Sequence, residues 1–312
     1  MTSQASPTHA GFDAPPLLQD APLLQVRDLT IGFSRADGRP GEALAVDGVS
    51  FSLHSGKTLC LVGESGCGKT VTALSLLRLL PMPPARHMGG SVLFDGQDLA
   101  SLPEETLRNL RGNKAGMIFQ DPMTSLNPVM RIKDQMTEGI RRHRNLSKKE
   151  ADLAALSMLE RVGIPDAASR MGAFPHQLSG GMRQRVMIGM ALMCDPLLLI
   201  ADEPTTALDV TVQKQILGLM RNLIDDSGSA LLLITHDLGI VAQIADEVAV
   251  MYAGRIVEQG SSKEVLQQPA HPYTDGLLRS RPGANTHKKR LEAISGTVPG
   301  LWSRPRGCAF HP

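Results

Sequence analysis

The chain has 312 residues, of which 32 are basic and 31 acidic, so its formal net charge is only +1. This balance gives no electrostatic basis for nucleic acid as the main partner, because nucleic-acid-binding domains are usually basic. Hydrophobic residues make up 42% and aromatic residues 3%, which predicts a globular core built from aliphatic side chains and methionine. The four cysteines are scattered along the chain and predict no disulfide framework.

Two features bear on the location and the N-terminal segment of the chain. A membrane-spanning helix needs about 20 mostly apolar residues, and the longest candidate, residues 186–201, is interrupted by Asp195 and Pro196. We therefore expect a cytosolic or peripheral protein. Residues 1–22 are rich in Pro, Ala, Ser and Gln, a composition that predicts a disordered leader.

The first part of the folded region reads as strands followed by a helix. Residues 23–33 and 43–53 alternate apolar and polar side chains, as strands with one buried face do. The short apolar run 58–62 ends at a glycine-rich turn. Residues 71–80 have the composition of a helix, which we expect Pro81 to stop.

A helical insertion is predicted in the middle of the chain. Short strands are expected at residues 91–94 and 116–119. After them, residues 130–143 and 148–162 have helical periodicity and mixed charge, with no strong strand pattern between them. We assign a helical subdomain to residues 121–180, inserted into a larger domain that spans residues 23–260.

A parallel sheet is predicted from the second half of the chain. Residues 196–201 and 230–235 are near-continuous apolar runs, typical of strands buried on both faces. Helix patterns at 211–224 and 238–245 alternate with these runs. Alternating strands and helices indicate an α/β fold with right-handed crossovers.

A phosphate-binding loop lies between the third predicted strand and the helix. Gly63–Thr70 fits G-x-x-x-x-G-K-[ST] in the context that this motif requires. Its glycines let the backbone approach a phosphate, and its N–H groups and the helix N-terminus attract an anion. We expect Lys69 to reach the β- and γ-phosphates, Thr70 to bind Mg²⁺, and the Cys67 thiol to face the nucleotide, where a thiol reagent would block ATPase activity. The predicted ATP-binding residues of this loop are Gly63, Glu64, Ser65, Gly66, Cys67, Gly68, Lys69, Thr70 and Val71.

Two carboxylates follow the apolar run at residues 197–201. Strand ends of open α/β sheets face the ligand crevice, and adjacent charges after five apolar residues are costly unless they meet a cation. We therefore expect Asp202 to hold the Mg²⁺ shell and Glu203 to orient or deprotonate the attacking water.

Leu178–Arg185 reads LSGGMRQR, which matches the signature of the ABC (ATP-binding cassette) transporter ATPases. Together with the phosphate loop, Asp202-Glu203 and His236, this closely resembles that family over residues 23–311. The resemblance implies a P-loop NTPase parallel sheet with an antiparallel β portion and an inserted helical subdomain. It implies ATP and Mg²⁺ as the bound nucleotide and metal.

The resemblance also implies roles for further residues. Gln120 resembles the glutamine that senses Mg²⁺ and the attacking water, and His236 the histidine that contacts the γ-phosphate. Phe33 lies where the family has an adenine-stacking ring, although a lone Phe at a strand end is equally a core residue. The implied catalytic residues are Glu203, His236, Lys69 and Gln120, and the implied Mg²⁺ ligands are Thr70, Gln120 and Asp202. The implied contacts to ATP held by the partner subunit are Ser179, Gly180, Gly181 and Asp209.

A narrower resemblance points to the oligopeptide and dipeptide importer branch. Its motifs are residues 119–128, 175–182, 271–274 and 296–300. Residues 261–312 are then a C-terminal extension of that type, apparently cut short. In this branch the tail usually carries more cysteines, so an iron–sulphur cluster is implied only if the chain continues beyond Pro312; Cys308 alone predicts no metal site.

These resemblances imply an ATPase subunit that powers uptake of di- or oligopeptides at the cytoplasmic face of the inner membrane. The expected partners are a second ABC ATPase, as a paralogue in a heterodimer, two permease subunits and an extracytoplasmic solute-binding protein, with no nucleic acid. Nickel, glutathione or another small solute stay open as the transported molecule. A soluble ABC ATPase acting on DNA or ribosomes is the alternative of another class. The compact 110-position spacing from Lys69 to Ser179 leaves no room for the long arms of DNA-repair types.

Overall fold

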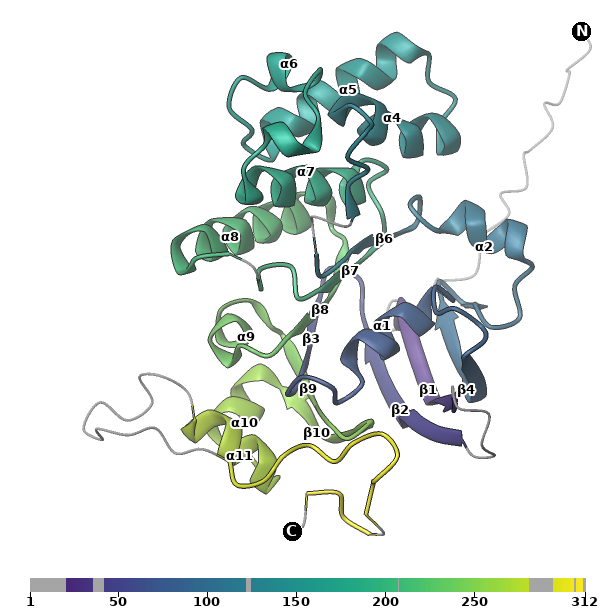
Figure 1. Ribbon diagram of the computed structural model, residues 1–312, viewed down its shortest axis with the longest axis vertical. Coiled ribbons are helices and arrows are strands. Elements are labelled where there is room, and N and C mark those ends of the chain that lie inside the picture. Colours follow the sequence, from purple (N-terminus) through teal and green to yellow (C-terminus); the bar gives the residue numbers. More distant parts are fainter. Residues whose placement is uncertain are drawn as a thin grey trace, which may run out of the picture.

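The computed structural model describes residues 21–35, 42–121, 125–206, 208–280, 294–305 and 307–310. The expected leader therefore lies almost entirely outside the described residues. Figure 1 shows three regions: helices at one end, a central sheet, and a smaller sheet beside it.

The smaller sheet is antiparallel and holds the N-terminal strands. Its order is β2-β1-β4-β5, and β1 pairs with both β2 and β4 in antiparallel register. The predicted strands at residues 23–33 and 43–53 are confirmed, and the one at 91–94 begins earlier than expected. The strands are β1 (Leu24–Ser34), β2 (Glu42–Leu53), β4 (Ala85–Phe94) and β5 (Gln97–Asp98).

The central sheet has six strands in the order β10-β9-β3-β8-β7-β6. Five of them are parallel to their neighbours, and β10 runs antiparallel to β9 at the edge. This confirms the predicted α/β fold with an antiparallel portion. The strands are β3 (Thr58–Val62), β6 (Ala115–Ile118), β7 (Leu198–Asp202), β8 (Ala230–Thr235), β9 (Glu247–Tyr252) and β10 (Arg255–Ser261).

Side chains of β3 divide between two hydrophobic cores because successive residues point to opposite faces of a sheet. Leu59 and Leu61 pack toward the antiparallel sheet. Cys60 and Val62 pack toward the helices on the other face. The apolar run of β3 is thus buried on both sides, as is typical of a strand in a sheet that is covered on both faces.

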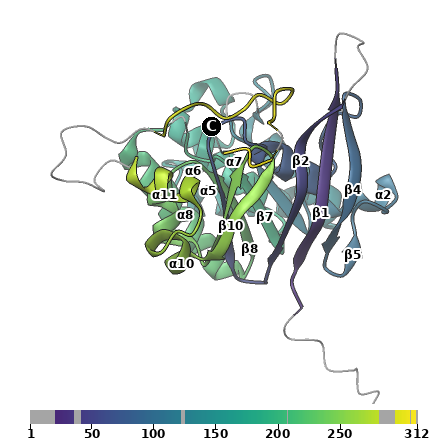
Figure 2. The same cartoon turned by 90° about the horizontal axis from the view of Figure 1, so that it is seen from below.

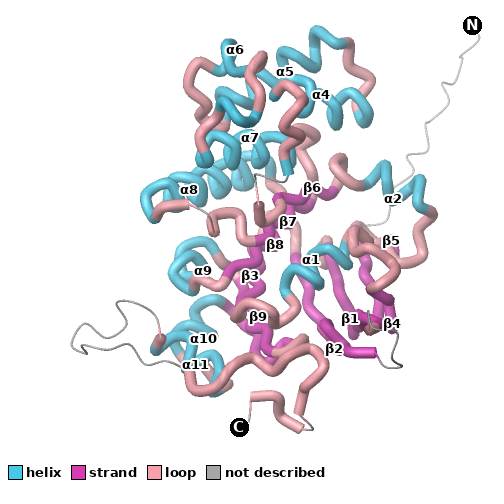
Figure 3. Tube along the Cα trace, viewed as in Figure 1, coloured by secondary structure: helices cyan, strands magenta, loops and turns pink. Residues whose placement is uncertain are grey.

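Helices cover the central sheet and form the end region seen in Figures 1 and 3. Among them, α4, α5 and α7 pack against one another, and the helical patterns at 130–143 and 148–162 are confirmed. The helices before the C-terminal region are α1 (Lys69–Leu76), α2 (Glu104–Leu110), α4 (Ile132–His143), α5 (Lys148–Arg161), α6 (Ala167–Arg170), α7 (Gly180–Leu192), α8 (Val210–Ser227) and α9 (Leu238–Ile244).

The end of α1 corrects the sequence prediction. The helix stops at Leu76, not at the prolines that follow Leu80. Arg78 takes a left-handed conformation (φ +51°), and the Leu79 N–H donates to the Leu74 carbonyl at 2.8 Å. A left-handed residue just past a helix terminates it with such a closing bond, so the stop is set before Pro81.

The C-terminal region packs back onto the central sheet. It contains α10 (Ser262–Gln267) and α11 (Pro272–Arg279). Residues 294–305 then cross near β10 toward the antiparallel sheet, as the yellow trace in Figure 2 shows. This crossing brings Pro299, Gly300, Leu301 and Arg304 to the edge of the pocket described below.

Candidate nucleotide-binding site

The phosphate loop connects β3 to α1, and its glycines fit a crowded path. Gly68 has φ +109°, and a Cβ there would lie 2.5 Å from the Ala45 carbonyl oxygen. A Cβ on Gly63 would lie 2.2 Å from the Met251 carbonyl oxygen. Both positions therefore require glycine. The turn leaves α1 beginning at Lys69, so the helix N-terminus opens toward the loop.

Lys69 is folded over the loop with only 4% of its side chain exposed. Its Nζ donates to the Gly63 carbonyl at 2.7 Å and to the Glu64 carbonyl at 2.9 Å. It also lies 3.9 Å from Glu203 Oε1. The Cys67 Sγ lies 3.9 Å from the same Nζ. A buried ammonium held by neutral carbonyl oxygens, a thiol and a carboxylate at 3.9 Å is ready to receive a bound anion.

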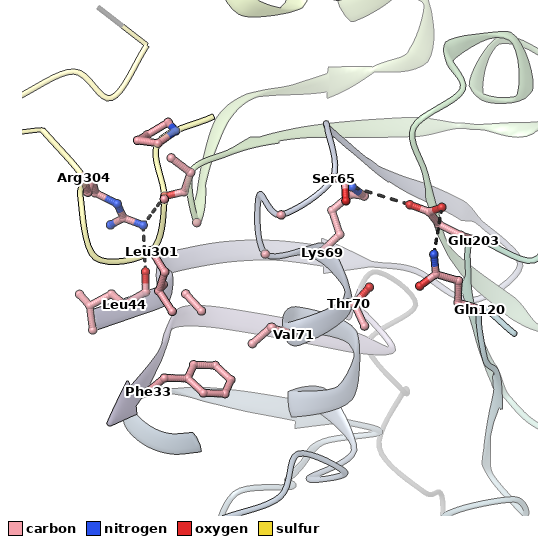
Figure 4. A pocket seen from close by; sticks show the side chains of 17 residues that line it. Phe33, Leu44, Ser65, Lys69, Thr70, Val71, Gln120, Glu203, Leu301 and Arg304 are labelled. Atoms are coloured by element: carbon pink, nitrogen blue, oxygen red, sulfur yellow. Dashed lines mark hydrogen bonds and ion pairs between the residues drawn. The ribbon is translucent and has the colours of Figure 1, made fainter. Parts of the chain in front are cut away.

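Glu203 lies at the centre of a cluster of polar groups just after β7. The Thr206 hydroxyl donates to Glu203 Oε2 at 2.7 Å, and His236 Nδ1 lies 3.3 Å from the same oxygen. Gln120 Nε2 donates to it at 3.5 Å, as Figure 4 shows. Glu203 has φ +44°, a left-handed conformation that is unusual for a residue with a side chain. The structure therefore brings together four of the predicted residues, Lys69, Gln120, Glu203 and His236.

Asp202 is the last residue of β7 and is 2% exposed. Burial raises the pKa of its carboxyl group, and the hydrogen bond from the Thr70 hydroxyl opposes this rise. Within the described part of the chain, Asp202 Oδ1 is buried without a hydrogen-bond partner. A buried carboxylate oxygen that lacks a partner beside a threonine hydroxyl fits an oxygen-ligated cation such as Mg²⁺.

A pocket of about 320 Å³ joins these groups to an apolar region. Figure 4 shows Lys69, Thr70 and Glu203 at one end and Phe33 with Val71 at the other. Phe33 therefore lies in the pocket and not only in the core. Several lining residues carry no sequence motif, because they contribute backbone or lie far along the chain: Leu44, Ala253, Gly254, Pro299, Leu301 and Arg304.

The position of Cys67 corrects one expectation. Its side chain is 1% exposed and packs in the core beneath the antiparallel sheet. Burial raises the pKa of the thiol, although the Lys69 ammonium 3.9 Å away opposes the shift. The expectation that this thiol faces the nucleotide is wrong, because the loop directs the Cys67 side chain into the hydrophobic core.

The predicted signature residues do not line this pocket. Ser179 is the N-cap of α7, and its Oγ accepts from the Met182 N–H at 3.3 Å. Ser179 and Gly180 are exposed, and a Cβ on Gly180 would meet nothing within 4 Å. Asp209 likewise caps α8, accepting from the Thr211 and Val212 N–H groups at 3.0 Å each.

Comparison with known families decides the identity of this arrangement. Residues 46–206 match the family described as ABC transporter, and residues 257–312 match the family described as oligopeptide/dipeptide transporter, C-terminal region. The chain belongs to the ABC transporter ATPase family. It is therefore an ATPase, and this membership implies binding of ATP with Mg²⁺.

Individual relatives resemble this ABC ATPase over most of its length. The oligopeptide transport ATP-binding protein OppD of Bacillus subtilis is 52% identical over 92% of this chain and 80% of its own. The dipeptide transport ATP-binding protein DppD of the same organism is 51% identical over 92% of this chain and 85% of its own. An ATP-binding cassette solved as a dimer in a post-hydrolysis state shares the fold, with a TM-score of 0.68 and 23% identity over 77% of this chain and 98% of its own.

Two structural features are absent from the described residues of this ABC ATPase. None of their helices is both long enough and apolar enough to cross a bilayer. No cluster of three or more His, Cys, Asp or Glu side chains suited to a metal was found among them either. Asp202 therefore lies outside any such cluster of described residues, and the polar side chain that hydrogen-bonds to its carboxyl group is the Thr70 hydroxyl.

Proposed function

We propose that this ABC ATPase powers the import of di- and oligopeptides, bound peripherally at the cytoplasmic face of a membrane and coupled to partner permeases. The observation that carries the proposal is the C-terminal match at residues 257–312 to the oligopeptide/dipeptide transporter region. The names of the relatives at 51% and 52% identity, which cover the same region, support it.

In this proposal the polar end of the pocket holds the triphosphate. Lys69 leaves the Gly63 and Glu64 carbonyls and binds the β- and γ-phosphates, where it neutralises charge. Thr70, Asp202 and Gln120 would hold Mg²⁺, which supplies further neutralisation of phosphate charge when bound. The buried Asp202 oxygen that lacks a partner supports this assignment.

Glu203 is proposed as the group that orients or deprotonates the attacking water. Its carboxylate is only 11% exposed, and Thr206 and His236 fix its position from two sides. His236 is 56% exposed, so it can reach a γ-phosphate at the open side of the pocket. Gln120, which begins the connection to the helical insertion, contacts the same carboxylate and would link hydrolysis to movement of that insertion.

A second ATPase subunit is needed to complete each site. Ser179 and Gly180 present an open helix N-terminus to solvent, and such a terminus attracts phosphate. We propose that two ATPases meet head to tail, so that this terminus and Asp209 meet ATP bound by the partner. The partner is proposed to be a paralogue.

The permease contact is proposed on the helical insertion. Val129 is 79% exposed, so its side chain is available to add apolar contact area to an interface. His176 and Gln177, in the short turn Pro175–Gln177 that precedes the signature sequence, are also exposed. These residues offer a mixed apolar and polar surface to a membrane subunit.

The test is co-expression with the products of neighbouring reading frames, purification in detergent, and ATPase assay with a panel of peptides and the solute-binding protein. Membrane subunits that co-purify and hydrolysis that peptides stimulate would support the proposal. Stimulation by nickel or glutathione in place of peptides would keep the importer and change its substrate. Co-purification with ribosomes or DNA, with no membrane subunit, would overturn the proposal.

A further inference from the structure

The pocket has a wall that no nucleotide motif supplies. Residues 299–304, here called the C-terminal strap, place Pro299, Gly300, Leu301 and Arg304 in the pocket lining. Figure 4 shows Leu301 beside Leu44, at the apolar end that also holds Phe33. The strap therefore borders the part of the pocket farthest from Lys69.

Arg304 fastens the strap to two elements of the ATPase core. Its Nη1 donates to Asp47 Oδ2 at 2.6 Å, and its Nη2 donates to the Leu44 carbonyl at 3.0 Å and to the Ala253 carbonyl. The side chain is 22% exposed, and Asp47 is 19% exposed. A guanidinium that is largely shielded from water and satisfied by a carboxylate and two carbonyls holds a fixed orientation.

The turn between β9 and β10, to which Arg304 donates a hydrogen bond, also contacts the phosphate loop. Ala253 and Gly254 connect β9 to β10, and the Gly254 N–H donates to the Cys67 carbonyl at 2.8 Å. The Asp47 N–H in turn donates to the Gly254 carbonyl at 2.8 Å. The strap is thus connected to the proposed phosphate-binding loop through the Ala253–Gly254 turn, by one hydrogen bond on each side of it.

Contacts on both sides of the strap keep it against the body of the protein. Before it, Val298 packs on the core beneath the helices. After it, the Phe310 ring packs 5.4 Å from the rings of Tyr252 and Tyr273, between centroids. Across it, the Arg35 guanidinium lies 4.6 Å from the Trp302 ring. This cation–π contact joins the strap to the residue that directly follows β1.

We propose that the C-terminal strap forms a binding wall for the base and ribose of the nucleotide, with Leu301 as the contact residue and Arg304 as the positioning residue. Leu301 is 39% exposed, so a flat aromatic ring placed between it and Phe33 would remove apolar surface from water. The phosphates lie at the other end and do not reach the strap. This inference rests on the proposed nucleotide site but not on the transported substrate.

The test compares two ligands on the full-length chain. Binding of ADP and of inorganic tripolyphosphate, both with excess Mg²⁺, is measured by calorimetry for wild type, Leu301→Ala and Arg304→Ala. Leu153→Ala, which truncates a leucine 58% exposed on α5, is the control for the first variant. Arg221→Ala, which removes an exposed ion pair with Asp225 on α8, is the control for the second. Trp302 is the single tryptophan of the chain, so its fluorescence reports on the strap in the wild type.

Leu301→Ala is expected to weaken ADP binding by about three- to tenfold, as loss of a half-buried leucine contact does. It should leave tripolyphosphate binding within about twofold of wild type. Arg304→Ala should weaken ADP binding at least as much, and ADP but not tripolyphosphate should change the Trp302 fluorescence. Both control variants should bind like wild type.

Equal losses for both ligands, or unchanged ADP binding in Leu301→Ala, would overturn the inference while leaving the nucleotide site intact. If Arg304→Ala does not fold, Leu301→Ala at its exposed position still decides the question. A wild-type chain that binds neither ligand would overturn the proposed nucleotide site and the strap together.

Discussion

The phosphate loop and the signature helix differ in how much of a binding site each one contains. The phosphate loop is surrounded by partners from the same chain: Lys69 is held by loop carbonyls, and Glu203 is held by Thr206 and His236. The N-terminus of α7 faces solvent, with Ser179 making its cap and Gly180 open. These side chains of the first region are already paired in the free protein, whereas the N-terminus of the second is exposed.

This difference follows from local physics. The buried lysine of the phosphate loop and the carboxylate of Glu203 need partners even without nucleotide, because unpaired buried charges are costly. Among the described residues, Asp202 Oδ1, which is buried without a partner, is the exception in this region. A helix N-terminus can leave its N–H groups to water at no such cost. The chain can therefore fold with the region around Lys69 and Glu203, here called the finished half, already paired. The N-terminus of α7 with Ser179 and Gly180, here called the open half, stays exposed. A head-to-tail pair would bring the two halves together.

The largest effect is expected from Glu203→Gln, which keeps the shape of the finished half but removes its base. Turnover should fall by about 10²–10⁴-fold, the usual contribution of a general base, while ATP binding persists because Lys69 and Thr70 remain. Steady-state ATPase assay and equilibrium ATP binding measure the two quantities. Glu104→Gln, an exposed carboxylate on α2 that pairs with Arg111, is the control. Turnover near wild type in Glu203→Gln would remove this residue from catalysis.

The open half is tested by Ser179→Asp, which preserves the cap and adds a charge. Aspartate caps a helix as well as serine does, but its charge should repel a γ-phosphate held by the partner subunit. In the assembled transporter we expect ATPase activity to fall about 10- to 100-fold, since like charges brought together cost several kcal/mol. In the isolated chain, ATP affinity should be unchanged.

Ser179→Asn is the matched control, because it caps without adding charge. If Ser179→Asp weakened ATP binding by the isolated chain, the two regions would act within one subunit, and the comparison between a finished and an open half would fail.

A smaller effect is expected from Tyr273→Phe, which removes a hydrogen bond between α11 and the phosphate loop. The Tyr273 side chain is fully buried, and its hydroxyl accepts from the Glu64 N–H of the phosphate loop at 2.9 Å. Removing the hydroxyl leaves that N–H without its partner, at a cost of about 1–2 kcal/mol in the free energy of unfolding. Thermal unfolding should show a lower Tm for Tyr273→Phe than for Tyr252→Phe, its neighbour in the same aromatic cluster. Equal Tm values would show that α11 does not support the loop.

The finished half could largely be predicted from sequence because its chemistry is local. A glycine-rich turn after an apolar strand, and two acids after another, each occupy a few consecutive residues, and parallel strands bring them to one edge of the sheet. The α/β fold class could be predicted from the alternation of strand and helix patterns along the second half of the chain. The sequence analysis predicts no strand at residues 247–252 or 255–261, where β9 and β10 lie. The run Glu247–Tyr252 is nevertheless mostly apolar and buried on both faces.

The strap could not be predicted because two of the three groups that hold Arg304 are backbone carbonyls, which every residue has. Arg304 binds the carbonyl oxygens of Leu44, 260 positions away, and of Ala253, 51 positions away. No side-chain pattern marks which carbonyl an arginine will meet over such separations. The direction of the Cys67 thiol was missed for a related reason. In an irregular turn, neither the helical nor the strand period tells which side chains point inward.

The smallest expected effect concerns chemical labelling of Cys67. It tests whether this thiol stays buried when no nucleotide is bound. Cys60, Cys67 and Cys194 are buried and Cys308 is exposed. Burial also raises the pKa of the Cys67 thiol, so little reactive thiolate should be present. A maleimide reagent without nucleotide should modify Cys308 first, read by mass spectrometry after proteolysis, while ATPase activity is retained. Cys308→Ser should abolish this fast phase. Rapid labelling of Cys67 would show that the loop opens in the free protein, because a thiol packed in the core reacts only when its surroundings separate.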